Sequence, residues 1–250
     1  MKFLPLAHVL SAAVLVAATS SCTTDRSPSM PAPVTGDAPG RELEQVYGRL
    51  GSDGGQVFTL DPAASKVRIY VFRDGRAARL GHNHVLSAPH FKGFAQRAAG
   101  DASASRFDLE FRLDELEFDL PEHRAGLGPA FASVLSAEAI AGTREHMLGE
   151  SNMQADRFPV VRIHSLRVRG EAPRYAAEVA VEMHGQLRTL WIALAVSGSP
   201  DHLTVAGNFV LRQTDFGIQP YSVAGGLLAV RDEVVVDFVL EGHPVDLRPT

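Results

Sequence analysis

From about Val57 onward, apolar and polar residues alternate with a period of two, in one short run after another. Successive side chains of a β-strand point to opposite faces, so this alternation predicts strands with one apolar and one polar face. The run 106–119 is the clearest, with an apolar set of Phe107, Leu109, Phe111 and Leu113. Other runs cover 66–72, 158–168, 175–183, 187–196, 203–211 and 234–241, and a further strand is expected at 84–94. We therefore predict about eight strands joined by short turns.

Only the segment 130–149 has apolar residues at the three- and four-residue spacing of a helix. Pro129 would lie in its first turn, and Gly142 is expected to break it into two pieces. Many strands and one helical insertion favour an all-β closed barrel or a sandwich. An eight-stranded barrel has an interior just wide enough for one small or slender ligand.

The N-terminal segment is typical of an export signal. Lys2 precedes an apolar stretch, and small residues then lead to Cys22, the only cysteine of the chain. The predicted organisation is a signal peptide at 1–21, a lipidated Cys22 with a flexible linker at 22–56, and a β-barrel domain at 57–245. Thr19 stands where a lipobox usually has Leu, so cleavage near Ala18, with Cys22 left as a free thiol, is the alternative.

Composition excludes several classes of protein. One cysteine cannot form an internal disulfide or a cysteine zinc cluster. The chain has 24 Lys and Arg against 29 Asp and Glu, a net charge of −5, and no basic run, which argues against nucleic acid as a partner. The common catalytic motifs of hydrolases, metalloproteases and nucleotide-binding enzymes are absent from the sequence. We therefore expect a protein that is not an enzyme and uses no cofactor.

One dense polar motif interrupts the apolar pattern at 80–86. On a strand, His82 and His84 would point to the same face, about 7 Å apart at a rise of roughly 3.3 Å per residue. Two imidazoles are only part of a metal site, which would need His164 or His184 from other strands as further ligands. We assign no metal, and keep His82, His84, His164 and His184 as the alternative ligand set. Otherwise His84 is a hydrogen-bonded polar group at the barrel mouth and His82 is a loop histidine.

Several stretches together resemble the YceI-like family of periplasmic, lipocalin-like proteins. These are Phe58–Pro62 with the strand Ser65–Phe72, His84 with Gly93-Phe94 downstream, Met153–Pro159 with Val161–Ser165, Gly185 with Leu187 and Thr189, and Leu211–Ile218. Arg188 and Leu190 depart from the usual end of the family's G-x-T turn, and the doubled histidine departs from its commoner single His. The resemblance covers roughly residues 57–241. It implies an extended eight-stranded lipocalin-like barrel with a helix near its mouth and an elongated apolar cavity for a polyisoprenoid or another long-chain amphiphile.

The function expected on this basis is non-enzymatic binding of a polyisoprenoid, quinone or fatty amide within the barrel. His84 is the first candidate to orient the ligand's headgroup, followed by His82, His164 and Arg212. Trp191 and Phe209 are the expected apolar contacts. The location expected is the periplasmic side of a bacterial envelope, with a lipid anchor in the outer membrane, and a homodimer is left open. The alternatives are a metal- or haem-associated redox or stress protein that uses the histidines, and a packed barrel that serves as an adaptor.

Overall fold

A computed structural model describes residues 41–51, 55–98 and 102–245 of the 250-residue chain. The expected signal peptide at 1–21, the lipidation site Cys22 and most of the expected linker lie outside these residues. The described helices include none that is both long and apolar enough to cross a membrane.

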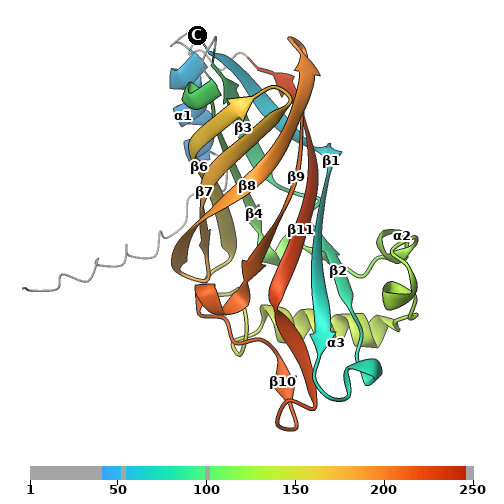
Figure 1. The fold of residues 1–250 in the computed structure, drawn as a ribbon. Helices are drawn as coiled ribbons and strands as arrows, with labels where there is room; N and C mark the ends of the chain where they lie inside the picture. Colours follow the sequence, from blue (N-terminus) through green and yellow to red (C-terminus); the bar gives the residue numbers. More distant parts are fainter. Residues whose placement is uncertain (1–40, 52–54, 99–101, 246–250) are drawn as a thin grey trace, which may run out of the picture. The chain divides into compact units, whose positions relative to one another are not determined.

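Eight antiparallel strands form a closed barrel, which confirms the fold class predicted from the alternation (Figure 1). Around the barrel each strand pairs with the next, in the order β1-β3-β4-β6-β7-β8-β9-β11, and β11 pairs back with β1. The strands are β1 (Gln56–Asp74), β3 (Lys92–Arg97), β4 (Arg106–Arg112), β6 (Val160–Glu171), β7 (Arg174–Met183), β8 (Gln186–Ser199), β9 (His202–Arg212) and β11 (Leu228–Pro244).

The strand β1 runs along the whole length of the barrel. The family resemblance suggested two strands here, whereas the structure has one, with a register shift against β11 between Asp61 and Lys66. Its first half pairs with β3, from Gln56 to Thr59, and its second half pairs with the short strand β2 (His84–Ser87). The predicted strand at 84–94 is therefore two strands, because the chain crosses from one half of β1 to the other between Ser87 and Lys92.

Two further short strands lengthen the sheet at its lower end. The strand β5 (Glu117–Phe118) pairs with β2, and β10 (Ser222–Val223) pairs with β11. The predicted run 106–119 is not one strand, because a 3-10 turn at Leu113–Glu115 separates β4 from β5. At this turn the N–H of Leu113 donates to the carbonyl of Pro159 at 2.8 Å, which ties the end of β4 to the start of β6.

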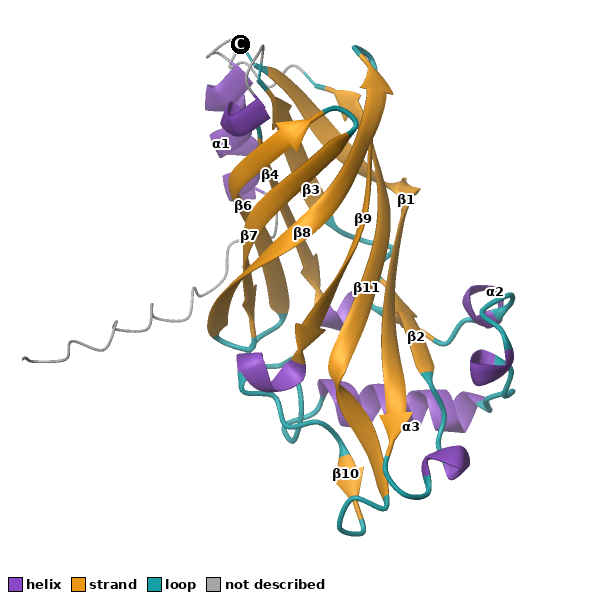
Figure 2. Ribbon diagram, viewed as in Figure 1, coloured by secondary structure: helices purple, strands orange, loops and turns teal. Residues whose placement is uncertain are grey.

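Within the described part of the chain, three α-helices accompany the barrel, along with several 3-10 turns (Figure 2). They are α1 (Arg41–Gly51), α2 (Pro121–Arg124) and α3 (Ala137–Leu148). The predicted helical segment at 130–149 is shorter than expected, and Gly142 does not break it. It begins at Ala137, and the preceding residue Ser136 is the N-cap, whose hydroxyl accepts a hydrogen bond from the N–H of Ala139 at 3.2 Å. Pro129 instead begins a separate 3-10 turn, Pro129–Phe131.

The helix α1 corrects the expectation that residues 22–56 form a flexible linker. Its apolar stripe packs on the outer face of the barrel, where Tyr47 is fully buried and stacks on Phe94 with ring centroids 5.3 Å apart. Leu43, Val46 and Leu50 complete this contact at helical spacing. The apolar stripe lies within eleven mostly polar residues and follows a segment rich in Ser, Pro and Gly. The composition of this region therefore indicates a linker more strongly than a helix.

A polar network fixes α1 to the barrel wall. The hydroxyl of Tyr47 donates to Asp108 Oδ2 at 2.7 Å, and His164 Nδ1 donates to Asp108 Oδ1 at 2.5 Å. The hydrogen bond to Asp108 is the main cause that raises the pKa of His164 above its ordinary value. Protonated His164 therefore stabilises the carboxylate that holds Tyr47.

This network predicts a pH-dependent contribution to stability. A group whose pKa is higher in the folded state adds stability that is complete below its unfolded pKa, about 6.5 for histidine, and is lost as the pH rises through the folded pKa. We expect His164→Gln to lower the thermal unfolding midpoint at pH 5 to 6, and the difference from wild type to shrink in alkaline buffer. Exposed His90 makes no hydrogen bond in the described structure, so His90→Gln is the matched control. A difference that stays constant with pH would contradict this assignment.

Candidate ligand-binding cavity

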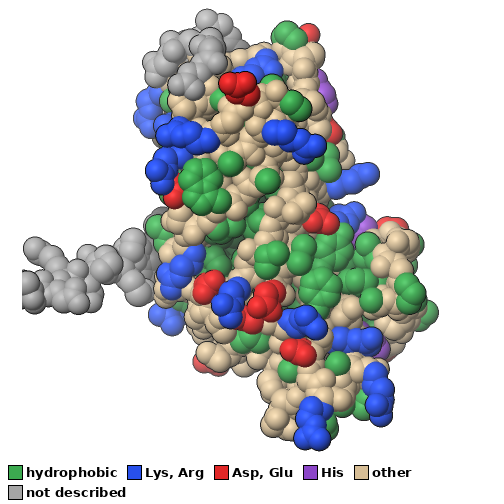
Figure 3. All heavy atoms as spheres, in the orientation of Figure 1, with side chains coloured by type: hydrophobic (Ala, Val, Ile, Leu, Met, Phe, Trp, Pro, Cys, Tyr) green, Lys and Arg blue, Asp and Glu red, His purple; other side chains and the backbone are tan. Residues whose placement is uncertain are grey.

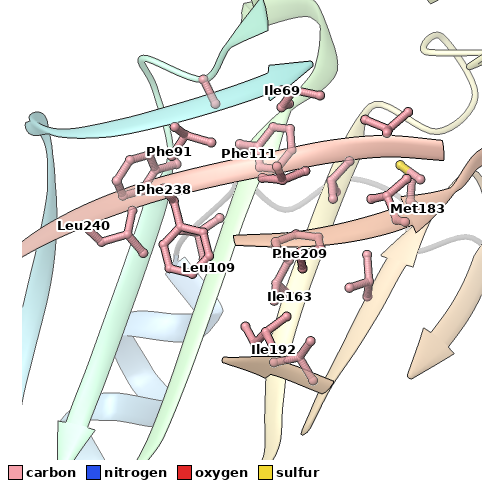
Figure 4. A pocket seen from close by; sticks show the side chains of 18 of the residues that line it. Ile69, Phe91, Leu109, Phe111, Ile163, Met183, Ile192, Phe209, Phe238 and Leu240 are labelled. Carbon is pink, nitrogen blue, oxygen red and sulfur yellow. The ribbon is translucent and has the colours of Figure 1, made fainter. Parts of the chain in front are cut away.

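The barrel encloses an elongated apolar cavity of about 860 Å³, within the range of small-molecule and cofactor sites. Figure 4 shows labelled side chains from strands on different sides of the barrel directed toward a shared space, among them Phe111, Phe209 and Phe238. The alternation predicted from the sequence produces this wall, because each strand turns its apolar face inward. Other wall residues are Val67, Ile69, Val71, Leu86, Leu109, Ile163, Val179, Val181, Ile192, Leu194, Leu211, Val234 and Val236.

The two ends of the cavity differ. At the end where β3 and β4 meet, the buried side chains of Phe58, Ala95 and Leu203 form a small apolar cluster. The cavity lining there also includes Arg97, Ser105 and the exposed Arg106. At the lower end, the cavity is bordered by α3 and by the segment before β10, and three of the bordering residues are exposed to solvent: Gly142, His146 and Tyr221. The rings of His146 and Tyr221 meet edge to face, with centroids 4.5 Å apart. We call this lower opening the mouth.

His84 is the polar residue of the wall with the most defined surroundings. On β2 it pairs with Val71 and shares the inward face with Leu86, as the alternation requires. Its Nδ1 lies 2.6 Å from Oδ2 of Asp119, whose side chain is completely buried. Asn83 holds the preceding loop, because its Oδ1 accepts from the N–H of Arg73 and its Nδ2 donates to the carbonyl of Ala130. The imidazole is therefore fixed in position before any ligand arrives.

Asp119 is also paired with a buried arginine. Arg124, on α2, donates from Nη1 to Asp119 Oδ1 at 2.5 Å and to the carbonyl of Asn83 at 2.9 Å. Its Nη2 donates to the carbonyl of Phe131 and to the hydroxyl of Ser133. The guanidinium thus joins β2 to the loop after α2, and only 8% of its side chain is exposed.

The charge state of Asp119 decides the tautomer of His84. Burial disfavours the carboxylate, but hydrogen bonds from His84, from the N–H of Val85 and from Arg124 outweigh burial and hold the pKa of Asp119 below its ordinary value. An ionised carboxylate only accepts hydrogen bonds, so Nδ1 of His84 carries the proton. The other ring nitrogen, Nε2, has no hydrogen-bond partner in the described part of the chain and remains free for a ligand.

Only some of the residues that the sequence proposed for the ligand site line the cavity. His84 and Phe209 line the cavity. His164 lies on the outer face of β6 against Asp108, and Trp191 is 51% exposed on the outer face of β8. Both expectations are corrected for the same reason: the neighbours Ile163 and Ile192 point inward, so these two residues point outward.

Two more of the proposed residues lie outside the cavity. Arg212, the last residue of β9, is 58% exposed and pairs with Asp232 at 3.1 Å. It follows the inward Leu211 and therefore points outward. His82 is exposed in the loop before β2, where its Nδ1 lies 3.2 Å from the hydroxyl of Ser133. It does not share a strand face with His84, because β2 begins only at His84.

The alternative metal ligands do not come together. His184 lies in the turn after β7 with its Nδ1 2.9 Å from the carbonyl of Phe216, while His164 lies on the outer face of the barrel and His82 in a loop. Within residues 41–51, 55–98 and 102–245, no group of three or more His, Cys, Asp or Glu side chains is arranged to hold a metal ion.

The sequence did not identify Asp119, Arg124, His146 or Tyr221. Asp119 and Arg124 are charged and stand in a mostly polar stretch, where nothing in the local pattern distinguishes a buried pair from an exposed one. His146 is exposed on α3 and also borders the mouth. Pro121, which begins α2, was the one signal that could have placed Arg124 in a helical turn.

Comparison with known proteins agrees with this architecture. The sequence model of the YceI-like domain matches residues 58–242. Among solved structures, BcnA of Burkholderia cenocepacia is 13% identical with a TM-score of 0.52, covering 73% of this chain and 98% of BcnA. A YceI protein of Campylobacter jejuni is 8% identical with a TM-score of 0.46, covering 63% of this chain and 83% of that protein. No curated protein matches the chain. At 13% identity, the likeness to BcnA shows the fold alone.

Because the Arg124–Asp119 ion pair is buried, a substitution that removes one of its charges should strongly lower the stability of the fold. Asp119→Asn leaves the Arg124 guanidinium buried without a counter-charge, so we expect a loss of about 3–5 kcal/mol in the free energy of unfolding. Urea titration at neutral pH measures this loss.

Asp114→Asn is the matched control for that loss. It removes a carboxylate that is 51% exposed and paired with Arg112 on the surface, and we expect it to cost less than about 1 kcal/mol in the free energy of unfolding. Equal effects of the two substitutions would show that the Arg124–Asp119 pair does not hold the cavity wall.

The contribution of Asp119 to stability should also depend on pH. Because the pKa of Asp119 is lowered in the folded state, this contribution should be complete above the ordinary aspartate pKa and disappear as the pH falls through the folded pKa.

Proposed function

The chain belongs to the family of YceI-like domains, and from this premise we propose that it is a non-enzymatic binding protein whose barrel shields a long-chain amphiphile. The ligand class is a polyisoprenoid, a quinone or a fatty amide. The observation that carries the proposal is the apolar cavity inside the barrel, which side chains from every barrel strand line.

The walls of the cavity support an apolar chain as the bound part of the ligand. Aromatic and aliphatic side chains from every barrel strand line it, and burying apolar surface contributes about 25 cal/mol per Å². This free energy is proportional to the apolar area that is buried and has no directional requirement. It therefore favours a long, slender apolar ligand and does not select a particular chemical group. A long unbranched or isoprenoid chain satisfies both requirements.

The polar groups support a small headgroup near the mouth. His84 offers one free ring nitrogen on an imidazole held by a buried carboxylate, and His146 and Tyr221 border the opening. A few fixed polar groups in an otherwise apolar site usually orient the ligand. We therefore infer that the apolar chain lies in the barrel and that a hydroxyl, carbonyl or amide group lies beside His84.

The proposed location follows from the N-terminal sequence. Export by the signal peptide and acylation of Cys22 would tether the barrel to the periplasmic side of a bacterial envelope, with an anchor in the outer membrane. Long-chain amphiphiles are poorly soluble in the aqueous space there. A closed barrel that covers the chain on all sides serves to sequester or carry them.

Filling the cavity tests the proposal. Val179 lies on the inner face of β7 and is 1% exposed, so Val179→Trp places an indole within the space the ligand would occupy. Titration with a fluorescent polyene fatty acid should show saturable one-to-one binding to the wild type and none to this variant. Overpacking a core costs about 1–3 kcal/mol, so circular dichroism should first establish that the variant is folded.

The same substitution on the outer face is the control. Val210 on β9 is 54% exposed, and Val210→Trp should bind the fatty acid as the wild type does. If a folded Val179→Trp barrel binds as tightly as Val210→Trp, the ligand does not lie in the cavity and the proposal fails.

A further inference from the structure

Two loops meet at the lower end of the molecule, next to the mouth. The first, residues 75–81, follows β1, and the second, residues 221–231, contains β10 and the start of β11 (Figures 1 and 2). The N–H of Ala77 donates to the carbonyl of Leu227 at 2.8 Å. Gly75 has φ +93°, and a Cβ there would lie 2.6 Å from the carbonyl oxygens of Gly226 and Leu227. Only glycine allows this close approach, so the loops form one surface, which we call the arginine tip.

The charge of the arginine tip is opposite to that of the whole chain. Its two loops contain three arginines, Arg76, Arg79 and Arg231, and no acidic residue, although the chain carries a net charge of −5. All three are exposed, and none of them forms an ion pair with another described residue. Of the two flanking acids, Asp232 forms an ion pair with Arg212 and accepts a hydrogen bond from Thr214. Asp74 accepts a hydrogen bond from the N–H of Gly75 and lies exposed at the edge of the tip.

Exposed apolar side chains lie among these arginines. Leu80 is 67% exposed, Leu227 44% and Val223 37%. On the face drawn in Figure 3, the lowest part of the molecule carries Lys or Arg side chains next to hydrophobic ones. Basic residues interspersed with apolar side chains are the composition of surfaces that bind the interface of anionic bilayers, where the cations meet phosphate groups and the apolar side chains enter the acyl boundary.

The arginine tip is continuous with the mouth of the cavity. Tyr221, at its edge, is 38% exposed and also lines the cavity. Val230 lines the cavity one residue before Arg231 and pairs with Arg73 at the end of β1. A surface in contact with the tip therefore lies beside the opening through which a ligand would pass.

We propose that the arginine tip docks on an anionic lipid bilayer, so that the mouth faces the membrane and a long-chain ligand passes between bilayer and barrel without crossing water. The features of the arginine tip alone support the docking, whereas the passage of ligand rests on the proposed function. Opposite charge and exposed apolar side chains at the same place favour a lipid surface over a protein partner.

Vesicle binding tests the docking. The chain from residue 22 onward with Cys22→Ser carries neither the apolar segment 1–21 nor an acylated cysteine, so any binding comes from the rest of the chain. We expect it to sediment with vesicles of phosphatidylglycerol and phosphatidylcholine and not with phosphatidylcholine alone. One basic residue near an anionic bilayer strengthens binding by roughly fivefold, so Arg76→Glu with Arg79→Glu should weaken binding by at least about tenfold. Leu80→Ser with Leu227→Ser should weaken the part of the binding that remains at high salt.

The matched control reverses two arginines at the opposite end. Arg169 and Arg174, beside the β6–β7 turn, are exposed and form no ion pair with a described residue, so Arg169→Glu with Arg174→Glu changes the net charge equally. Docking through the tip predicts that this control binds within about twofold of the parent chain. Equal losses in both double variants, or equal binding to the two kinds of vesicle, would overturn the proposal.

A separate measurement distinguishes vesicle binding through the arginine tip from vesicle binding through the cavity. The cavity-filled Val179→Trp chain, also with Cys22→Ser, should bind anionic vesicles as the parent chain does. If it binds vesicles but no fatty acid, the docking surface and the cavity are independent, as proposed. If filling the cavity abolishes vesicle binding, the vesicles are held through the cavity and the tip is not the docking surface.

Discussion

The pairing of β11 with β1 is the constraint on which the rest of the structure depends. It joins the last strand of the sheet to the first, so that every apolar strand face turns toward one interior. In an eight-stranded ring these faces meet across a space that side chains only partly fill, and a cavity of about 860 Å³ remains. The same pairing brings the ends of β1 and β11 together at the lower end, where the mouth and the arginine tip lie. The closed fold, the cavity and the arginine tip therefore have one common cause.

The alternation of apolar and polar residues predicted the barrel and much of the cavity wall. Phe107, Leu109 and Phe111 point inward as the period of two requires, and Phe209 does so on β9. The same rule, applied strictly, would also have placed His164 and Trp191 outside, since Ile163 and Ile192 beside them are apolar and lie inside. Those two expectations were wrong because the position of a residue in the alternation, and not its chemical type, decides which face of the strand it lies on.

What the sequence could not predict depends on contacts between distant segments. The predicted strand 84–94 is two strands because β2 pairs with the second half of β1 and β3 pairs with its first half. No local sequence signal marks the crossing between the two halves. Asp119 and Arg124 are buried because the loop after α2 covers them, a fact that only the assembled chain contains. The helix α1 was missed because a narrow apolar stripe within eleven polar residues gains its stability from the barrel surface, not from its own composition.

Native mass spectrometry of gently purified protein tests whether the cavity holds one long-chain amphiphile. We predict a second population heavier than the polypeptide by the mass of one such molecule, and recovery of that molecule by organic extraction. For Val179→Trp we expect only the mass of the polypeptide. A wild-type spectrum without bound mass, an extract without long-chain lipid, and no uptake of added isoprenoid or quinone would show that the cavity does not hold such a ligand.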